Sequence, residues 1–336
     1  MTTTPAIMLC HRGVGGDNQI YWSIGVQDEN NRVTWPRRAP IPFGTDTCRT
    51  ETGVSVMTVG DVVYCAFVDT NDVLQCARYK KDANGVPGWT VEQMNGNMSD
   101  RRPCLIMFGD ELWCLHRGAG GDHHLYYTIR VGLTEMPWSP DKIFGDTLSA
   151  PLTSQGPAAV VAKDNVLSVV YVTEEDNLNG QIRVVNYDEP QGVGQFSAPY
   201  DLSKIYSHHI PSLLWYKDRI VCIFKNAEDK KISTMTVQAA GDKNRLTVAV
   251  SPFNNGSGQT VDGPTLVQLR HRTDEHFALY SIYRGIGEDG WLYFSAFWGE
   301  DPFNKSKWVD ERRVGEGDEE HNDFYEVGAD SFLHDS

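Results

Sequence analysis

The chain contains a short motif that recurs at a regular interval. HRGVGGDNQIYW begins at His11, HRGAGGDHHLYY begins at His116, and YRGIGEDGWLYF begins at Tyr283. Three weaker copies lie between them, and the six anchor positions are 49 to 59 residues apart: His11, Phe67, His116, Val170, Phe224 and Tyr283. This period is typical of propellers and solenoids, in which each repeat is one supersecondary unit that packs on its neighbours. A length of 336 residues therefore does not require two or three domains.

Each repeat is predicted to form antiparallel strands. Short apolar runs that end in a turn precede the later anchors, as in VSVMTVGD, PCLIMFGD and PSLLWYKD, and a second apolar run follows each turn. β-Branched and aromatic residues dominate both runs, and Gly-Asp or Lys-Asp fills the turns, which indicates β-hairpins. No helical period persists for more than about one turn. Two further strands after each anchor bring the number in each unit to four.

We therefore predict an all-β fold, a six-bladed β-propeller with four antiparallel strands per blade in a single domain over residues 1–336. The predicted blades are 5–52 with 322–332, 53–101, 102–150, 151–206, 207–260 and 261–313. The first unit has too few residues before His11 for its first strand. The segment Val327-Gly328-Ala329-Asp330 is similar to TVGD and MFGD in the first strands of units two and three, so we expect a C-terminal strand to close the ring. The alternative is that this acidic end forms a disordered tail.

Charge and composition restrict the partners. The formal net charge of −15 argues against nucleic acid and anionic membranes, which are bound through clustered Lys and Arg, and favours neutral or cationic ligands. The chain has no apolar run long enough to insert into a membrane. The N-terminal residues lack the pattern of a signal peptide, so we expect a cytoplasmic protein, with non-classical secretion as the alternative. The sequence predicts no cofactor and does not indicate an oligomeric state.

Units one, three and six keep the full motif, which combines Arg-Gly, an Asp three residues before an aliphatic residue, and an aromatic pair. The candidate ligand-binding residues are Arg12, Asp17, Tyr21 and Trp22; Arg117, Asp122, Tyr126 and Tyr127; and Arg284, Asp289 and Tyr293. Arg donates a planar fork of hydrogen bonds, Asp accepts them, and a ring face packs on sugar C–H groups. This set of side chains is suited to hydroxyl-rich ligands.

A structural role for the same residues stays open. Arg and Asp could pair across the hairpin, the glycines could serve only to permit positive φ, and the aromatic rings could fill the space between blades. Units two, four and five have Val68-Asp69, Tyr171-Val172 and Lys225-Asn226 in place of Arg-Gly. Because these units are expected to fold without the motif, the comparison favours binding.

Further candidates carry weaker signals. They are His11, His116, Trp215, Trp291 and Trp298, although tryptophan in a repeat also packs between sheets. The adjacent pairs His123-His124 and His208-His209 do not predict a metal site, because neighbouring residues of a strand point to opposite faces. The seven cysteines include no C-x-x-C pair. We therefore predict no metal ligands.

The stretch LWCLHRGAGGDHHLYY resembles the repeats of sialidase-like six-bladed propellers and of fungal and bacterial propeller lectins. The lectin resemblance implies a multivalent carbohydrate-binding protein, in which several weak sites gain avidity on a glycan-covered surface. The Phe-Arg-Ile-Pro segment and the Ser-x-Asp-x-Gly-x-x-Trp boxes of sialidases are absent, and catalysis needs one asymmetric cluster rather than repeated equivalents. A lectin without catalytic residues is therefore the favoured interpretation. The alternatives are a sialidase-like glycoside hydrolase with divergent motifs and a propeller scaffold that binds protein.

Overall fold

The protein is described from a computed structural model. The described residues are 3–13, 17–28, 33–35, 38–82, 84–131, 137–145, 150–162, 165–174, 180–188, 195–239, 246–253, 259–270, 277–285, 291–297, 308, 312–314 and 325–335.

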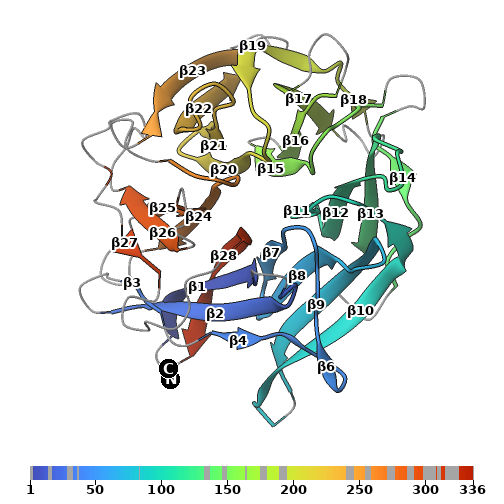
Figure 1. Ribbon diagram of the computed structural model, residues 1–336, viewed down its shortest axis with the longest axis vertical. Helices are drawn as coiled ribbons and strands as arrows, with labels where there is room; N and C mark the ends of the chain where they lie inside the picture. Colours follow the sequence, from blue (N-terminus) through green and yellow to red (C-terminus); the bar gives the residue numbers. More distant parts are fainter. Residues whose placement is uncertain are drawn as a thin grey trace.

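Six antiparallel sheets of strands surround a central axis (Figure 1). Blade 1 contains β28 (Tyr325–Asp335), β1 (Thr3–Arg12), β2 (Ile20–Gln27) and β3 (Val33–Thr34), with β4 (Ala39–Pro40) also paired to β2. Blade 2 contains β7 (Ser55–Val59), β8 (Val62–Val68), β9 (Val73–Lys81) and β10 (Pro87–Met98). Blade 3 contains β11 (Cys104–Phe108), β12 (Glu111–Arg117), β13 (Leu125–Val131) and β14 (Lys142–Ile143).

The other half of the ring repeats this order. Blade 4 contains β15 (Ala158–Ala162), β16 (Val166–Val172), β17 (Gln181–Asp188) and β18 (Gln195–Phe196), with β19 (Tyr200–Tyr206) also paired to β17. Blade 5 contains β20 (Ser212–Tyr216), β21 (Arg219–Lys225), β22 (Ile232–Ala239) and β23 (Leu246–Pro252). Blade 6 contains β24 (Thr265–Arg270), β25 (Phe277–Arg284), β26 (Leu292–Phe297) and β27 (Arg312–Arg313). A small separate hairpin joins β5 (Pro42–Phe43) and β6 (Asp46–Thr47). The predicted six-bladed fold is confirmed, with four consecutively paired strands in each blade and one additional strand in blades 1 and 4.

The hydrophobic core lies between the blades. The second strands, such as VVYCAFV in β8 and VLSVVYV in β16, are buried along almost their whole length because both faces pack against a neighbouring sheet. Six clusters of buried apolar side chains are found among the described residues, and each joins two neighbouring blades. Continuous apolar runs therefore mark these strands better than strict alternation does.

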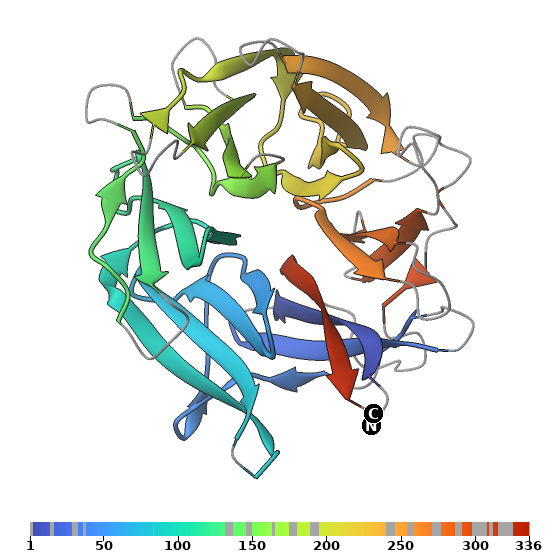
Figure 2. The same ribbon diagram turned by 180° about the vertical axis from the view of Figure 1, so that it is seen from behind.

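The C-terminal strand closes the ring, as the sequence predicts. β28 pairs antiparallel with β1 in a register that places Gly328 opposite Cys10 and Phe332 opposite Ala6. Its other neighbours are β7 of blade 2 and β24 of blade 6, so it occupies the inner position that each other blade fills with its own first strand. Figures 1 and 2 show β28 beside β1, with the two chain ends next to each other.

The chain passes from blade to blade through a recurring hydroxyl turn. A buried Ser or Thr hydroxyl donates to the backbone carbonyl two residues ahead and accepts from the amide of that residue, which is the local bonding that Ser and Thr favour in turns. Within the described ranges, the residues that do this are Thr50, Ser99, Thr153, Ser207 and Thr260. The sequence analysis did not predict this recurring Ser or Thr turn at the blade junctions.

No helix in the described part of the chain is long and apolar enough to cross a membrane.

Candidate functional site

The motif of blade 3 forms the end of one hairpin. His116 in β12 lies directly opposite Tyr126 in β13, and their rings stack with centroids 5.9 Å apart. The Tyr126 hydroxyl donates to Oδ2 of Asp122 at 2.7 Å, and Oδ1 of Asp122 accepts the backbone N–H of His124 at 3.1 Å. The aspartate thus holds the turn between the strands and fixes the tyrosine hydroxyl.

Blade 1 repeats this arrangement. His11 lies opposite Tyr21 with ring centroids 5.7 Å apart, the Tyr21 hydroxyl donates to Asp17 at 2.7 Å, and Asp17 accepts the amide of Gln19 at 3.1 Å. In blade 6, Tyr283 stacks in the same way on Tyr293, with centroids 6.3 Å apart. The candidate Asp289 lies outside the described residues.

In blades 1 and 3, the glycine after the motif arginine has no room for a Cβ atom. A Cβ atom on Gly118 would lie 2.7 Å from the backbone oxygen of Asp122, and one on Gly13 would lie 2.8 Å from that of Asp17. Gly120, by contrast, has a φ of 66°. In blade 3, Gly120 and Gly121 (φ of 88°) therefore adopt the left-handed conformation that the sequence interpretation assigned to the motif glycines, whereas Gly118 does not.

The motif arginines contact the junctions between blades. Arg117 is 3% exposed, donates to the Ser154 carbonyl at 3.1 Å, and lies 3.6 Å from an Asp100 carboxylate oxygen. Burial lowers the pKa of Arg117, and Asp100 opposes that shift. The pairing across the hairpin that was the structural alternative is wrong for blade 3, because Arg117 pairs with Asp100 of the preceding junction and Asp122 bonds to Tyr126.

The other two arginines make similar contacts. Arg12 donates to the carbonyl of Glu51, and Arg284 lies 3.5 Å from an oxygen of Asp262. In blade 5, Lys225 fills the equivalent position and donates to the Val261 carbonyl at 2.7 Å. These cationic side chains therefore contact the segments that join neighbouring blades. Their contact with a ligand stays a prediction.

The candidate aromatic residues fall into two groups. Tyr21, Tyr126 and Tyr293 belong to the stacked pairs at the hairpin ends, whereas Tyr127 is buried and stacks on Trp113 at 4.6 Å. Trp22 packs against Tyr79 and Trp89 of blade 2, at 5.2 and 5.8 Å.

The remaining tryptophan candidates lie in blades 5 and 6. Trp215 packs against the cluster between blades 4 and 5, and Trp291 packs against the cluster between blades 6 and 1. Trp298 lies outside the described residues. Ligand contact by these tryptophans also stays a prediction.

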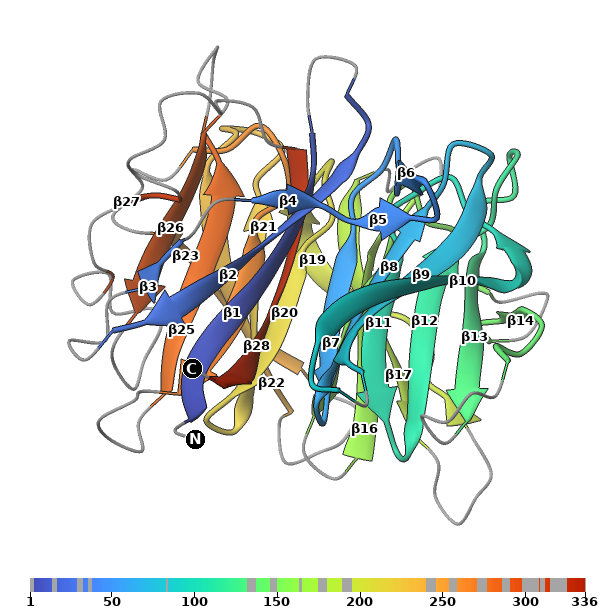
Figure 3. The same cartoon turned by 90° about the horizontal axis from the view of Figure 1, so that it is seen from below.

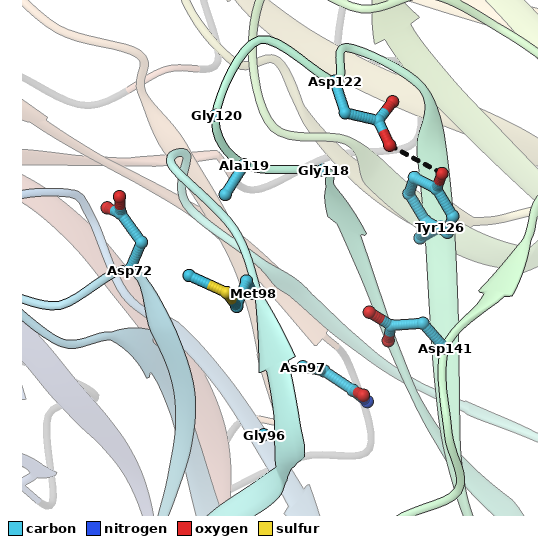
Figure 4. Close-up of a pocket in the computed structure, with 10 residues that line it drawn as sticks. All are labelled: Asp72, Gly96, Asn97, Met98, Gly118, Ala119, Gly120, Asp122, Tyr126 and Asp141. Carbon is cyan, nitrogen blue, oxygen red and sulfur yellow. Dashed lines mark hydrogen bonds between the residues drawn. The ribbon is translucent and has the colours of Figure 1, made fainter.

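A pocket of about 520 Å³ lies between blades 2 and 3 at the level of the motif (Figure 4). Its described lining is Asp72, Gly96, Asn97, Met98, Gly118, Ala119, Gly120, Asp122, Tyr126 and Asp141. Asp122 and Tyr126 are thus the two predicted residues that the structure brings into the pocket.

A bulge in the outer strand of blade 2 forms one wall. Asn95 and Gly96 adopt positive φ angles of 55° and 71°, and the register of β10 on β9 shifts between Gln93 and Met98. Bulges redirect side chains at sheet edges, and here Asn97 and Met98 lie beside the motif of blade 3 (Figure 4). β10 is the outermost strand of its blade (Figure 3).

The wall residues differ in how firmly they are held. Asn97 donates to the Ser139 carbonyl of blade 3 at 3.1 Å, whereas the Met98 side chain is 47% exposed. Asp72 is exposed at a φ of 62° in the turn between β8 and β9. The pocket thus has a fixed amide and two accessible side chains on its blade 2 side.

The pocket is acidic. Asp72, Asp122 and Asp141 contribute carboxylates, and none of the described lining residues is Lys or Arg. Partial burial raises the pKa of Asp122, but the hydrogen bonds from Tyr126 and His124 outweigh this and lower it. Burial and the bond to Asp122 raise the pKa of Tyr126 to about 12. Asp122 is therefore ionised and Tyr126 is a neutral phenol at neutral pH.

The carboxylates are not arranged as a metal centre. No group of three or more His, Cys, Asp or Glu side chains within the described ranges could hold a metal ion. Asp141 accepts a hydrogen bond from His116 Nε2 at 3.0 Å. What remains for a ligand is a set of hydrogen-bond acceptors beside the apolar surface of Met98 and Ala119.

Sequence reasoning missed the five lining residues outside the blade 3 motif, namely Asp72, Gly96, Asn97, Met98 and Asp141. Asn95-Gly96 inside a predicted strand was an available signal for a bulge, because this dipeptide favours positive φ. Asp141 could have been found by aligning WSPD of blade 3 with WPRR of blade 1.

Comparison with known proteins relates the chain to others by structure alone. No known family model matches it, and no curated protein matches its sequence. AofleA from Arthrobotrys oligospora is similar with a TM-score of 0.60 and 12% identity, over 98% of this chain and 93% of that one. Aleuria aurantia lectin is similar with a TM-score of 0.56 and 10% identity, over 95% and 97%.

The fold is a six-bladed β-propeller that this chain shares with a fungal lectin. The structure of Aleuria aurantia lectin is described as a six-bladed β-propeller with a novel mode of fucose recognition, so the predicted resemblance to fungal propeller lectins is confirmed at the level of the fold. The α-L-arabinofuranosidase of Fusarium graminearum shares the fold less closely, with a TM-score of 0.52 and 12% identity over 83% of this chain and 88% of that one.

Proposed function

We propose that the protein is a carbohydrate-binding lectin, and that the pocket between blades 2 and 3 is one of its sites. The observation that carries the proposal is the combination of exposed hydrogen-bond acceptors and an apolar wall in one hollow formed by two rigid sheets. Sugars present hydroxyl donors around a ring that also has C–H faces, so they need both kinds of surface.

The charge of the pocket favours neutral or cationic sugars. Asp72, Asp122 and Asp141 accept hydrogen bonds from hydroxyl or ammonium groups, and their charge repels carboxylated or sulfated sugars. Met98 and Ala119 provide the apolar contact. This expectation agrees with the acidic character of the whole chain.

Binding without hydrolysis is favoured by the lowered pKa of Asp122. A glycoside hydrolase needs a carboxyl group whose pKa is raised so that it donates a proton to the leaving group. The pKa of Asp122 moves in the opposite direction, because the carboxylate is already hydrogen-bonded by Tyr126 and His124. The structural likeness to propeller lectins supports the same choice, whereas the likeness to an arabinofuranosidase keeps hydrolysis as the alternative to exclude.

The repeated hairpin end suggests more than one site. Blade 1 carries the same stacked histidine and tyrosine and the same bonded aspartate as blade 3. Weak sites on separate blades would act together on a surface that carries many glycans, and the gain would come from effective concentration rather than from new contacts.

Replacing Asp72 with glycine tests the pocket. Glycine suits the positive φ of this residue, so Asp72→Gly removes a carboxylate acceptor with little effect on the fold. We expect roughly tenfold weaker binding of the glycans that the wild type selects on an array, measured by calorimetry, because hydrogen bonds to charged groups contribute about 1.5–3 kcal/mol.

Asp218→Gly is the matched control. Asp218 is also exposed, has a φ of 68°, and lies in a turn of blade 5 away from the pocket. Equal binding by wild type and Asp72→Gly would contradict the assignment of this pocket. Turnover of chromogenic glycosides by the wild type would favour the hydrolase instead.

A further inference from the structure

The hairpin ends of blades 1 and 3 can be compared residue by residue. Tyr21 pairs with Pro40 of β4, and Tyr126 pairs with Ile143 of β14. On the next segment, Gln19 bridges to Arg49 and His124 bridges to Leu152. The strand register therefore defines which residue of blade 1 corresponds to which residue of blade 3 without any need for sequence similarity.

Two positions beside the shared tyrosine differ in charge. Arg38 lies two residues before Pro40, as Asp141 lies two residues before Ile143, so these residues correspond. Arg49 corresponds to Leu152. Blade 1 thus has two cations where blade 3 has an anion and an apolar side chain.

Both arginines lie close to Tyr21. The Cζ atom of Arg38 is 4.6 Å from the centroid of the Tyr21 ring. Burial and Asp17 raise the pKa of Tyr21, while the charges of Arg38 and Arg49 act on it in the opposite direction. Burial and the nearby Arg38 lower the pKa of His11 to about 3, so this histidine stays neutral beside the arginine.

Two acidic side chains in this region already have partners among the described residues. Asp17 accepts the Tyr21 hydroxyl and the Gln19 amide. Asp46 lies 3.9 Å from Arg49, and the side chains of this pair are 72% and 46% exposed, so water screens their attraction. Arg49 therefore presents an accessible guanidinium next to Tyr21 in a protein whose overall charge is −15.

We propose that the blade 1 copy of the motif binds the anionic group of an acidic sugar, a carboxylate or a sulfate, at Arg38 and Arg49 beside Tyr21. This rests on the proposed carbohydrate binding. Guanidinium groups bind such anions through paired N–H donors. The protein then has two dissimilar sites, one for acidic glycans in blade 1 and one for neutral or cationic glycans between blades 2 and 3.

The test uses the full chain on an array that carries the same glycans in neutral, sulfated and uronic acid forms. The wild type is expected to bind neutral forms and at least one acidic form, and the two acidic arms identify which anion is preferred. Arg49→Gln should weaken binding of the acidic forms by about tenfold and leave binding of the neutral forms unchanged. Raising the ionic strength from about 0.05 to about 0.5 M should weaken the acidic forms selectively.

Arg101→Gln is the control, because the Arg101 side chain is 41% exposed and lies 4.0 Å from Asp100, much like Arg49 beside Asp46. Arg38→Gln provides a second variant, with thermal unfolding to confirm that it folds. If acidic forms bind no better than background while Asp72→Gly weakens the neutral forms, the inference fails and the proposed function stands. If Arg49→Gln and Arg38→Gln both bind acidic forms as the wild type does, the inference also fails. An array without any binding overturns both.

Discussion

Within the motif, buried and accessible side chains have different roles. Arg117 is almost fully buried at a junction between blades, whereas Asp122 and Tyr126, which follow within ten residues, line the pocket. Their chemistry alone does not separate them, because each could bind a sugar. Arg117 has the structural role because the end of β12 directs its guanidinium toward the Ser154 carbonyl.

Replacing Arg117 with methionine should destabilise the protein. The change leaves the Ser154 carbonyl without this donor and Asp100 without its cation, so we expect a loss of about 2–3 kcal/mol in the free energy of unfolding, measured in urea. Arg101→Met is the control. Arg101 donates to the same carbonyl at 3.3 Å, but its side chain is 41% exposed, so its loss should be less than about 1 kcal/mol. A stable Arg117→Met variant that had lost glycan binding would instead support the ligand contact predicted from the sequence.

At the level of elements, local signals in the sequence predict the hairpins but not the pocket. Gly60-Asp61 and Gly109-Asp110 fix turns between adjacent strands, so the first two strands of blades 2 and 3 could be placed without knowledge of the rest. The pocket depends on a bulge in β10 that faces the hairpin end of another blade. No spacing within one repeat encodes that contact. An alignment of the repeats in blades 1 and 3 does show that Arg38 stands where blade 3 has Asp141.

The hydroxyl turns at the blade junctions offer a test at this scale. Thr153 is fully buried, and its Oγ1 lies 2.7 Å from the Gln155 carbonyl and 3.0 Å from that of Val172. Thr153→Val keeps the shape and removes the donor, so we expect a loss of about 1–3 kcal/mol in the free energy of unfolding. Thr90→Val on the exposed face of β10 should change stability by less than about 0.5 kcal/mol. Equal stability of the two variants would show that the junction turn is held by its neighbours rather than by its hydroxyl.

For the whole molecule, pairing of the two chain ends closes the ring, and a closed ring gives every blade a neighbour on both sides. The six apolar clusters each need two neighbouring sheets, and the clusters on both sides of blade 1 include residues of β1. A propeller that is open at one point loses packing on both sides of the gap and exposes sheet edges. The sequence predicts the closing strand because its Val-Gly-Ala-Asp segment is similar to the first strands of units two and three.

Deleting residues 322–336 should therefore remove more stability than any single substitution. It eliminates β28, leaves one edge of β1 unpaired, and removes the neighbour of β7 and β24. We expect a loss of at least about 5 kcal/mol, which is comparable to the total stability of many domains, so the truncated chain should fail to unfold cooperatively on heating. A sharp transition at the wild-type midpoint would contradict the closure.

Moving β28 to the other end of the chain, rather than deleting it, distinguishes the effect of ring closure from the effect of a shorter chain. Thr3 pairs with Asp335, and the two ends of the chain lie next to each other (Figure 2). A chain in which residues 322–336 precede Met1 through a short glycine linker can form the same β28–β1 pairing as a simple hairpin. We expect this rearranged protein to regain a cooperative thermal transition and the proposed glycan binding, because neither proposed site depends on where the chain begins. A rearranged chain that stayed unfolded while the original order folded would mean that β28 must arrive last, after the other five blades have formed.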